Sequence, residues 1–143
     1  MKITCVIPAH LASTRFPEKI LHVFNGAPLI EHTWRAAMQV SLFDEVIIAL
    51  DSPKTARIVA QFGGTYIMTD PELPSGTHRI IAATQEKKSD IWVNWQADEP
   101  LVNQHMITDL LVHARHTHQP HIWTLKTAIT QPALIHNPHA VKV

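Results

Sequence analysis

The sequence predicts an α/β fold, a three-layer sandwich in which helices cover both faces of a mostly parallel sheet. Short apolar runs alternate along the chain with segments whose apolar residues recur at helical spacing. The apolar runs are continuous, which is typical of parallel strands buried on both faces. The chain has 143 residues, the usual length of one domain, so we expect a single folding unit.

The predicted strands are rich in β-branched and aromatic residues and end at polar or proline-containing loops. In order they are residues 3–9 (ITCVIPA), 45–50 (EVIIAL), 65–68 (TYIM), 91–95 (IWVNW) and 121–129 (HIWTLKTAI). The closing residues 140–143 (AVKV) have the same apolar strand pattern. Helices between the five strands give the expected order βαβαβαβαβ.

The predicted helices place apolar residues three and four positions apart. They cover residues 28–40, 53–62, 75–88 and 103–116. Ser52, Ser75 and Asn103 stand where the last three helices begin, and their side chains suit the N-cap position. Pro53 suits the first helical turn after Ser52.

Composition excludes several classes of protein. Twelve Lys and Arg residues balance twelve Asp and Glu residues, so long-range attraction to nucleic acid is not expected. We find no apolar stretch of membrane-spanning length and no signal peptide, which favours a cytoplasmic protein. The single cysteine, Cys5, lies in the first predicted strand and is interpreted as an inert core thiol rather than a nucleophile.

Polar residues gather in the loops after the first, third and fourth strands. Because ligands of such sheets bind beyond the carboxyl ends of the strands, these loops form the candidate site. Their polar residues are Ser13, Arg15, Lys19, Ser75, Thr77, Arg79, Gln96, Asp98 and Glu99. Cations and hydroxyls suit phosphate oxygens, and a carboxylate suits magnesium, so a nucleoside triphosphate with its metal fits. The alternative is that Arg15 and Lys19 are solvated loop charges and Asp98 caps a turn.

Four ordered stretches, three of which contain a recognisable motif, carry a resemblance to a known family. VIPAHLASTRFPEKIL, FGGTYIMTDPELPSGTHRI, VNWQADEPLV and NPHAVKV resemble successive blocks of the 3-deoxy-manno-octulosonate (Kdo) cytidylyltransferases, the CMP-Kdo synthetases of lipopolysaccharide assembly. The family patterns are close to PARxASxRxPGKPL, SGTxR and QGDEP. The resemblance runs from Ile3 to Val143 and implies a Rossmann-like nucleotidyltransferase fold of the nucleotide-diphospho-sugar transferase type.

The resemblance implies a role for each matching residue. The residues that would bind the nucleotide are Pro8, Ala9, His10, Ser13, Arg15, Lys19, Ser75, Thr77, Arg79 and Gln96. Among these, Ser13, Arg15 and Lys19 would hold the phosphates of CTP, and Gln96 would lie between nucleotide and sugar. Arg15, Lys19 and Asp98 would be catalytic, and Asp98 would also bind Mg²⁺.

The implied reaction is attack of the anomeric hydroxyl of Kdo on the α-phosphorus of CTP, which gives CMP-Kdo and pyrophosphate. The family acts as a homodimer. Its members continue beyond NPHAVKV with a second half that supplies most of the sugar-acid site, so residues 1–143 are interpreted as the nucleotide-binding part of a truncated enzyme. Two functions stay open, a cytidylyltransferase and an impaired or non-catalytic CTP-binding fragment. A different sugar or cofactor nucleotidyltransferase fits the motifs less well.

Four positions depart from the family patterns. His10 replaces an arginine, Glu18 and Ala97 replace glycines, and His78 replaces an acidic residue. His10 removes a permanent positive charge and Glu18 adds a negative one near the expected phosphates. We therefore expect a weakened phosphate site.

Two further patterns have structural interpretations. The histidines of HARHTHQPH, His113, His116, His118 and His121, could ligate a metal at this spacing, but a solvated helix end is the favoured interpretation. The four tryptophans, Trp34, Trp92, Trp95 and Trp123, are interpreted as core residues. Trp95 is the one exception to test, because it stands next to Gln96 and could stack on a base.

Overall fold

The computed structural model describes residues 1–12, 16–116, 121–138 and 140–142. Its contacts divide the chain into two compact units, Met1–Thr108 and Asp109–Val143, and each unit is described by itself. Residues 1–108 are called unit 1 and residues 109–143 unit 2. That the whole chain is one domain stays a prediction.

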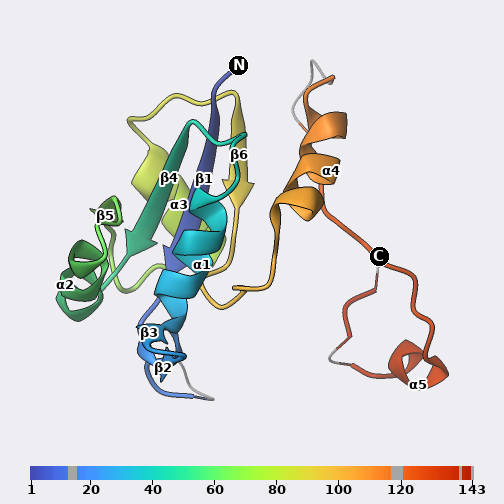
Figure 1. Ribbon diagram of the computed structural model, residues 1–143, viewed down its shortest axis with the longest axis horizontal. Helices are drawn as coiled ribbons and strands as arrows, with labels where there is room; N and C mark the ends of the chain where they lie inside the picture. Colours follow the sequence, from blue (N-terminus) through green and yellow to red (C-terminus); the bar gives the residue numbers. More distant parts are fainter. Residues whose placement is uncertain (13–15, 117–120, 139, 143) are drawn as a thin grey trace. The chain divides into compact units, whose positions relative to one another are not determined.

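A parallel sheet forms the centre of unit 1 (Figure 1). Its four strands among the described residues are β1 (Ile3–Ala9), β4 (Glu45–Leu50), β5 (Tyr66–Met68) and β6 (Ile91–Asn94). They lie in the order β5-β4-β1-β6, and each neighbouring pair is parallel. The predicted α/β fold with a mostly parallel sheet is therefore confirmed.

Strand β1 is the central member of the sheet. Val6 lies opposite Ile47 of β4 on one side and Asn94 of β6 on the other. Every residue of β1 is buried, as its continuous apolar sequence predicts. Cys5 is fully buried, which confirms its assignment to the core, and burial raises the pKa of its thiol.

Helices lie on both faces of this sheet (Figure 1). They are α1 (Leu29–Met38), α2 (Pro53–Gln61) and α3 (Gly76–Thr84). Val6 and Ala49 form a cluster with Ala83 of α3 on one face. Ile48 alternates to the opposite face, where it and Val59 of α2 both lie close to Gly64. This arrangement is the three-layer sandwich expected from the sequence.

The predicted helix starts are confirmed by hydrogen bonds. The Ser52 hydroxyl accepts a bond from the Lys54 amide (3.2 Å), and the Ser75 hydroxyl accepts one from the His78 amide (3.3 Å). At helix α4 (Gln104–Ala114), the Asn103 side chain accepts a bond from the Met106 amide (3.2 Å). Each cap satisfies an N–H group that the helix itself leaves unpaired.

A hairpin between β1 and α1 is a feature that the sequence analysis missed. Strands β2 (Val23–Phe24) and β3 (Ala27–Pro28) pair antiparallel across Asn25 and Gly26. Both turn residues have positive φ angles, 47° and 81°. Asn-Gly is the dipeptide that such two-residue turns favour, so the signal was present in FNGAP. The short 3₁₀ helix η1 (Lys19–Leu21) precedes the hairpin.

The prediction of a fifth strand at residues 121–129 is wrong. This stretch has no regular secondary structure, and Ile122 is fully exposed. A strand needs a neighbour for its backbone hydrogen bonds, and no described strand pairs with this stretch. Residues 140–142 of AVKV are not a strand either. The helix that unit 2 does contain after residue 121 is the short α5 (Pro132–Ile135).

In the described parts of both units, no helix combines the length and the hydropathy needed to cross a membrane.

Candidate functional site

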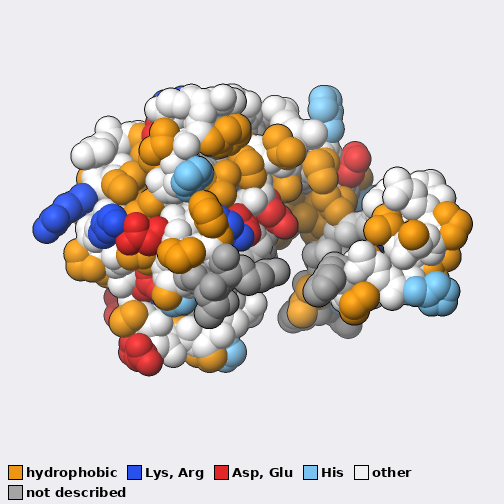
Figure 2. All heavy atoms as spheres, turned by 90° about the horizontal axis from the view of Figure 1, so that it is seen from below, with side chains coloured by type: hydrophobic (Ala, Val, Ile, Leu, Met, Phe, Trp, Pro, Cys, Tyr) orange, Lys and Arg blue, Asp and Glu red, His pale blue; other side chains and the backbone are white. Residues whose placement is uncertain are grey.

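The candidate site lies at the carboxyl ends of β1 and β6. From β1 the chain builds the sheet in one direction through β4 and β5, whereas β6 lies on the other side of β1. Ligands of open α/β sheets bind at such a switch in strand order. The strands run downward in Figure 1, so Figure 2, seen from below, shows the face at which they end. Basic, acidic and hydrophobic side chains are interspersed on this face.

Lys19 and Asp98 join the loops that follow these two strands. The Lys19 ammonium donates a hydrogen bond to the Asp98 carboxylate across 79 positions of sequence. Both side chains are more than one third exposed. The structure thus brings together the predicted phosphate-binding cation and the predicted metal ligand at a place that solvent and ligands can reach.

The start of α3 packs closely against both loops. A methyl group added at Gly76 would lie 3.2 Å from the ring of Pro8 and 3.6 Å from the side-chain oxygen of Gln96. Three predicted site segments therefore converge at Gly76, and a glycine is the residue that permits this approach. Ser75 and Thr77 are exposed beside it. Gln96 donates a hydrogen bond to the Asn94 side chain (2.8 Å).

Asp51, which the sequence analysis did not select, organises the end of β1. It directly follows β4, and its side chain is only 4% exposed. One carboxylate oxygen accepts a bond from the Leu11 amide (3.1 Å), and the other pairs with the His10 ring. The signal in the sequence was its position, since an acidic residue directly after a buried strand faces the ligand edge of the sheet.

Arg79 is buried behind Asp51 rather than exposed at the surface. Its guanidinium lies 3.4 Å from the Asp51 carboxylate and donates to the Thr69 hydroxyl and the Asp70 carbonyl (2.5 and 3.1 Å). Its side chain is 2% exposed. A buried cation of this kind requires such partners. The contact between Arg79 and a nucleotide stays a prediction.

Glu18 occupies its position in the left-handed backbone region, with φ 53° and ψ 29°. A glycine would adopt this conformation without strain, which explains the glycine of the resembled pattern. The Glu18 carboxylate accepts two bonds from the Lys54 ammonium (2.8 and 2.6 Å). The negative charge added by Glu18 is therefore balanced by a cation in the first turn of α2.

The QADEP loop is anchored by core contacts. The Trp95 ring is 2% exposed, and its N–H donates to the Glu99 carbonyl (2.9 Å). Trp95 is thus a core residue and not a stacking surface. The Ala97 carbonyl accepts a bond from the Thr33 hydroxyl (2.8 Å).

Trp34 packs half-buried against Phe62, with ring centroids 5.0 Å apart, whereas the core prediction is wrong for the more exposed rings of Trp92 and Trp123.

The carboxylates of Asp98 and Glu99 suit a divalent cation that arrives with a nucleotide. Desolvation raises the pKa of the Glu99 carboxyl, and the charge of Asp98 raises it further. Mg²⁺ is commonly held by one or two carboxylates together with substrate phosphates and waters. Within the described ranges, no group of three His, Cys, Asp or Glu side chains could hold a metal by itself.

Of the remaining predicted site residues, some are described by the structure and others lie outside the described residues. Pro8 and Ala9 are buried at the end of β1. Ser13 and Arg15 lie outside the described residues, as does His118 of the histidine cluster. The His78 ring forms a hydrogen bond with the hydroxyl of the capping residue Ser75 (2.7 Å), so the histidine that replaces the family's acidic residue supports the start of α3.

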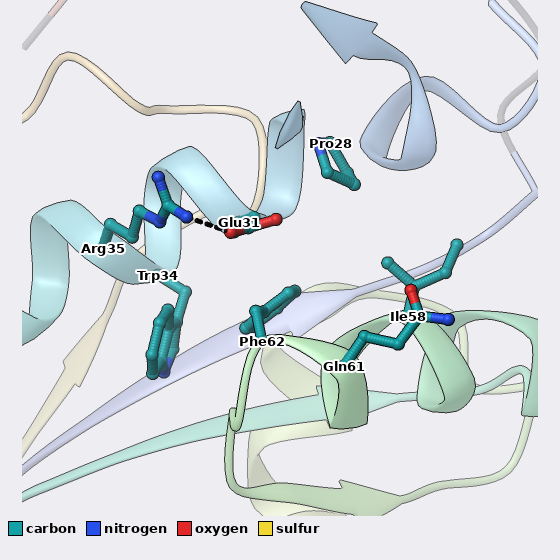
Figure 3. Close-up of a pocket in the computed structure, with 7 residues that line it drawn as sticks. All are labelled: Pro28, Glu31, Trp34, Arg35, Ile58, Gln61 and Phe62. Atoms are coloured by element: carbon teal, nitrogen blue, oxygen red, sulfur yellow. Dashed lines mark hydrogen bonds and ion pairs between the residues drawn. The ribbon is translucent and has the colours of Figure 1, made fainter. Parts of the chain in front are cut away.

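A pocket of about 290 Å³ lies apart from this edge, between α1 and α2 (Figure 3). It is lined by Pro28, Glu31, Trp34, Arg35, Ile58, Gln61 and Phe62. Arg35 donates to Glu31 at its rim (2.5 Å). None of the predicted site residues lines this pocket.

A comparison with protein families matches residues 4–143 to the model described as cytidylyltransferase. A curated 3-deoxy-manno-octulosonate cytidylyltransferase of Chlorobium chlorochromatii is 39% identical over 146 aligned positions, covering 100% of this chain and 58% of the relative. One from Myxococcus xanthus is 45% identical over 103 positions, covering 71% of this chain and 42% of the relative. The chain therefore spans little more than half the length of the first of these relatives.

A solved structure is similar over most of the chain. It is described as CMP:2-keto-3-deoxy-manno-octonic acid synthetase complexed with CTP. The two share 37% of residues with a TM-score of 0.78, over 80% of this chain and 48% of that chain. This likeness supports the nucleotidyltransferase fold expected from the motifs.

Proposed function

Because the chain belongs to the cytidylyltransferase family, we propose that it is the nucleotide-binding part of a CMP-Kdo synthetase and binds CTP with Mg²⁺. The site is the edge where β1 and β6 end. The substrate that we propose as acceptor is Kdo, which the names of the relatives specify for those proteins. The setting that we propose is the cytoplasm, in lipopolysaccharide biosynthesis.

The observation that carries this proposal is the pairing of Lys19 with Asp98. A cation and a carboxylate from two different loops meet at the strand-order switch, where neither is needed for the core. Phosphate oxygens of CTP would compete with Asp98 for the Lys19 ammonium. Binding of the triphosphate would thereby release the Asp98 carboxylate for the metal.

Each group would then have a separate role. Lys19, with Ser13 and Arg15, would hold the phosphates, and the Pro8–Gly76–Gln96 contact would form the wall beside the base and sugar. Bound Mg²⁺, held by Asp98 and the phosphates, would supply positive charge where charge develops during transfer. The protein's contribution is orientation and charge stabilisation rather than covalent chemistry.

The reaction that we propose joins the anomeric oxygen of Kdo to the α-phosphorus of CTP. The bond between the α-phosphorus and the bridging oxygen breaks, pyrophosphate leaves with that oxygen, and the attacking hydroxyl loses its proton. The groups that hold the acceptor are expected in the part of the relatives that this chain does not cover. A second candidate is therefore a fragment that binds CTP without turnover.

A thermal-shift titration tests the nucleotide proposal. CTP with Mg²⁺ should raise the melting temperature of the chain, because a ligand that binds only the native state stabilises it. ATP with Mg²⁺ is the matched control and should raise it less. An equal response to both nucleotides would contradict cytosine recognition, and no response to either would contradict the site.

Asp98→Asn tests the metal assignment. The substitution should remove most of the Mg²⁺ dependence of CTP binding in calorimetry while leaving the fold intact, because Asp98 is an exposed loop residue. Asp70→Asn is a control on the loop after β5, where the Asp70 carboxylate accepts a hydrogen bond from the Glu72 amide (2.8 Å). Unchanged metal dependence in Asp98→Asn would assign Asp98 to the Lys19 pair alone.

Pyrophosphate release from CTP and Kdo separates the two candidates. We expect little turnover by residues 1–143 alone and restored turnover when a family second half is attached, since orientation of the acceptor contributes about 7 kcal/mol or more. Rapid turnover by the 143-residue chain would mean that the acceptor site lies within the residues described above as core.

A further inference from the structure

Two of the departures from the family patterns, His10 and Glu18, have partners in one short segment. His10 pairs with Asp51, and Glu18 pairs with Lys54. Asp51 directly follows β4, and Lys54 lies in the first turn of α2. The two ends of the loop after β1 are thus both joined to the short segment where β4 leads into α2, although they are eight positions apart in sequence.

Each of these two contacts is called a joint, and the two joints differ in burial. Asp51 is nearly buried and lies 3.4 Å from the Arg79 guanidinium, so the joint at His10 and Leu11 rests on a buried charged pair. The Lys54–Glu18 joint is about half exposed on both sides, yet it is bidentate and it holds a residue whose backbone is in the left-handed region. Lys54 thereby stabilises a conformation that a non-glycine residue disfavours.

We propose that Asp51 and Lys54 are positioning residues that hold the two ends of the β1 loop for the nucleotide. The effect on CTP rests on the proposed function, whereas the effect on the loop itself does not. Lys54 affects nucleotide binding indirectly, by way of Glu18. It neutralises the Glu18 carboxylate and holds the Glu18 backbone in place next to Lys19. Asp51 acts through the Leu11 amide and the His10 ring.

Lys54→Ala is the first test, with two readouts. Without nucleotide, amide hydrogen exchange at Leu21, whose N–H donates to the Glu18 carbonyl (2.8 Å), should accelerate. With Mg²⁺ and CTP, the dissociation constant should rise about two- to fivefold, the range of an exposed ion pair. Lys54→Arg should restore both values. The control Lys87→Ala breaks a similar pair with Glu45 (2.6 Å) at the opposite end of β4 and should change neither.

A double-mutant cycle with Glu18→Gly separates positioning from direct contact. If Lys54 acts through Glu18, Lys54→Ala weakens CTP binding in the Glu18 background and has no effect in the Glu18→Gly background. An equal loss in both backgrounds would make Lys54 a direct phosphate ligand and overturn the proposal. No loss in either, with unchanged exchange at Leu21, would also overturn it.

Asp51→Asn tests the joint that Asp51 forms with His10 and Leu11. The amide of Leu11 should exchange faster, and CTP should bind more than about tenfold more weakly, because a buried pair is broken. Asp51→Glu should restore part of the binding. If the Asn variant does not fold, the Lys54 cycle still decides the proposal. If the unaltered chain fails to bind CTP, the proposed function fails, while the exchange measurements still test the two joints.

Discussion

Strand β1 and residues 121–129 have similar compositions and opposite structures. Both are rich in β-branched and apolar residues, and both are predicted as strands. β1 lies between β4 and β6 and is buried along its whole length. Residues 121–129 belong to no strand among the described residues, and Ile122 is fully exposed. Apolar composition therefore specifies a strand only where neighbouring backbones complete its hydrogen bonds.

Matched substitutions in the two segments should give the largest difference. Ile7→Ala empties a fully buried position in β1 and should lower the free energy of unfolding by about 2–5 kcal/mol. Ile122→Ala removes the same atoms from an exposed position and should change it by less than about 0.5 kcal/mol. Urea unfolding followed by circular dichroism measures both. Similar losses for the two variants would show that residues 121–129 are buried in solution.

A second substitution tests whether the close packing of β1 continues to its carboxyl end. Gly76→Ala places a methyl group 3.2 Å from Pro8, so the Pro8 ring must shift slightly. We expect a loss of about 1 kcal/mol in stability, at the low end for overpacking, together with weaker CTP binding in calorimetry.

Gly63→Ala is the control for this substitution. Gly63 has φ 78° and no atom near its missing side chain, so its strain should lower stability by about 1 kcal/mol without changing CTP affinity. Equal CTP affinities for both variants would argue against a nucleotide beside Pro8.

The first four strands and three helix starts could be predicted from the sequence because these depend on local signals. Strand 45–50 and the caps Ser52, Ser75 and Asn103 were predicted directly, since apolar runs and capping side chains act on their own segments. The strand at 121–129 was predicted wrongly because pairing is a tertiary property. The position of Asp51 after a buried strand was a signal, but its role could not be predicted, because its partners His10 and Arg79 are distant in sequence.

The smallest expected effect is at the amino end of β4. Hydrogen bonding from Lys87, with a further bond from Lys2, lowers the pKa of Glu45. A lowered folded-state pKa means that this stabilisation is present above the unfolded-state pKa and is lost as the pH falls through the folded-state pKa.

The free energy of unfolding should therefore fall less on acidification in Glu45→Gln than in the unaltered chain. The difference should be less than about 1 kcal/mol, because the pair is partly exposed. Urea midpoints between pH 3 and 7 (roughly the range in which carboxyl groups titrate) measure it. A larger loss would mean that a surface pair, and not burial, holds this strand in place.

Amide hydrogen exchange with and without Mg²⁺ and CTP shows directly whether CTP binds where β1 and β6 end. Exchange is resolved by residue and covers both segments of the comparison in one experiment. We expect new protection at the ends of β1 and β6 and at the start of α3, in residues 10–12, 75–79 and 96–99. We expect no change in residues 121–129. Protection confined to residues 121–129, or no protection at the strand ends at saturating CTP, would show that the nucleotide does not bind at this edge.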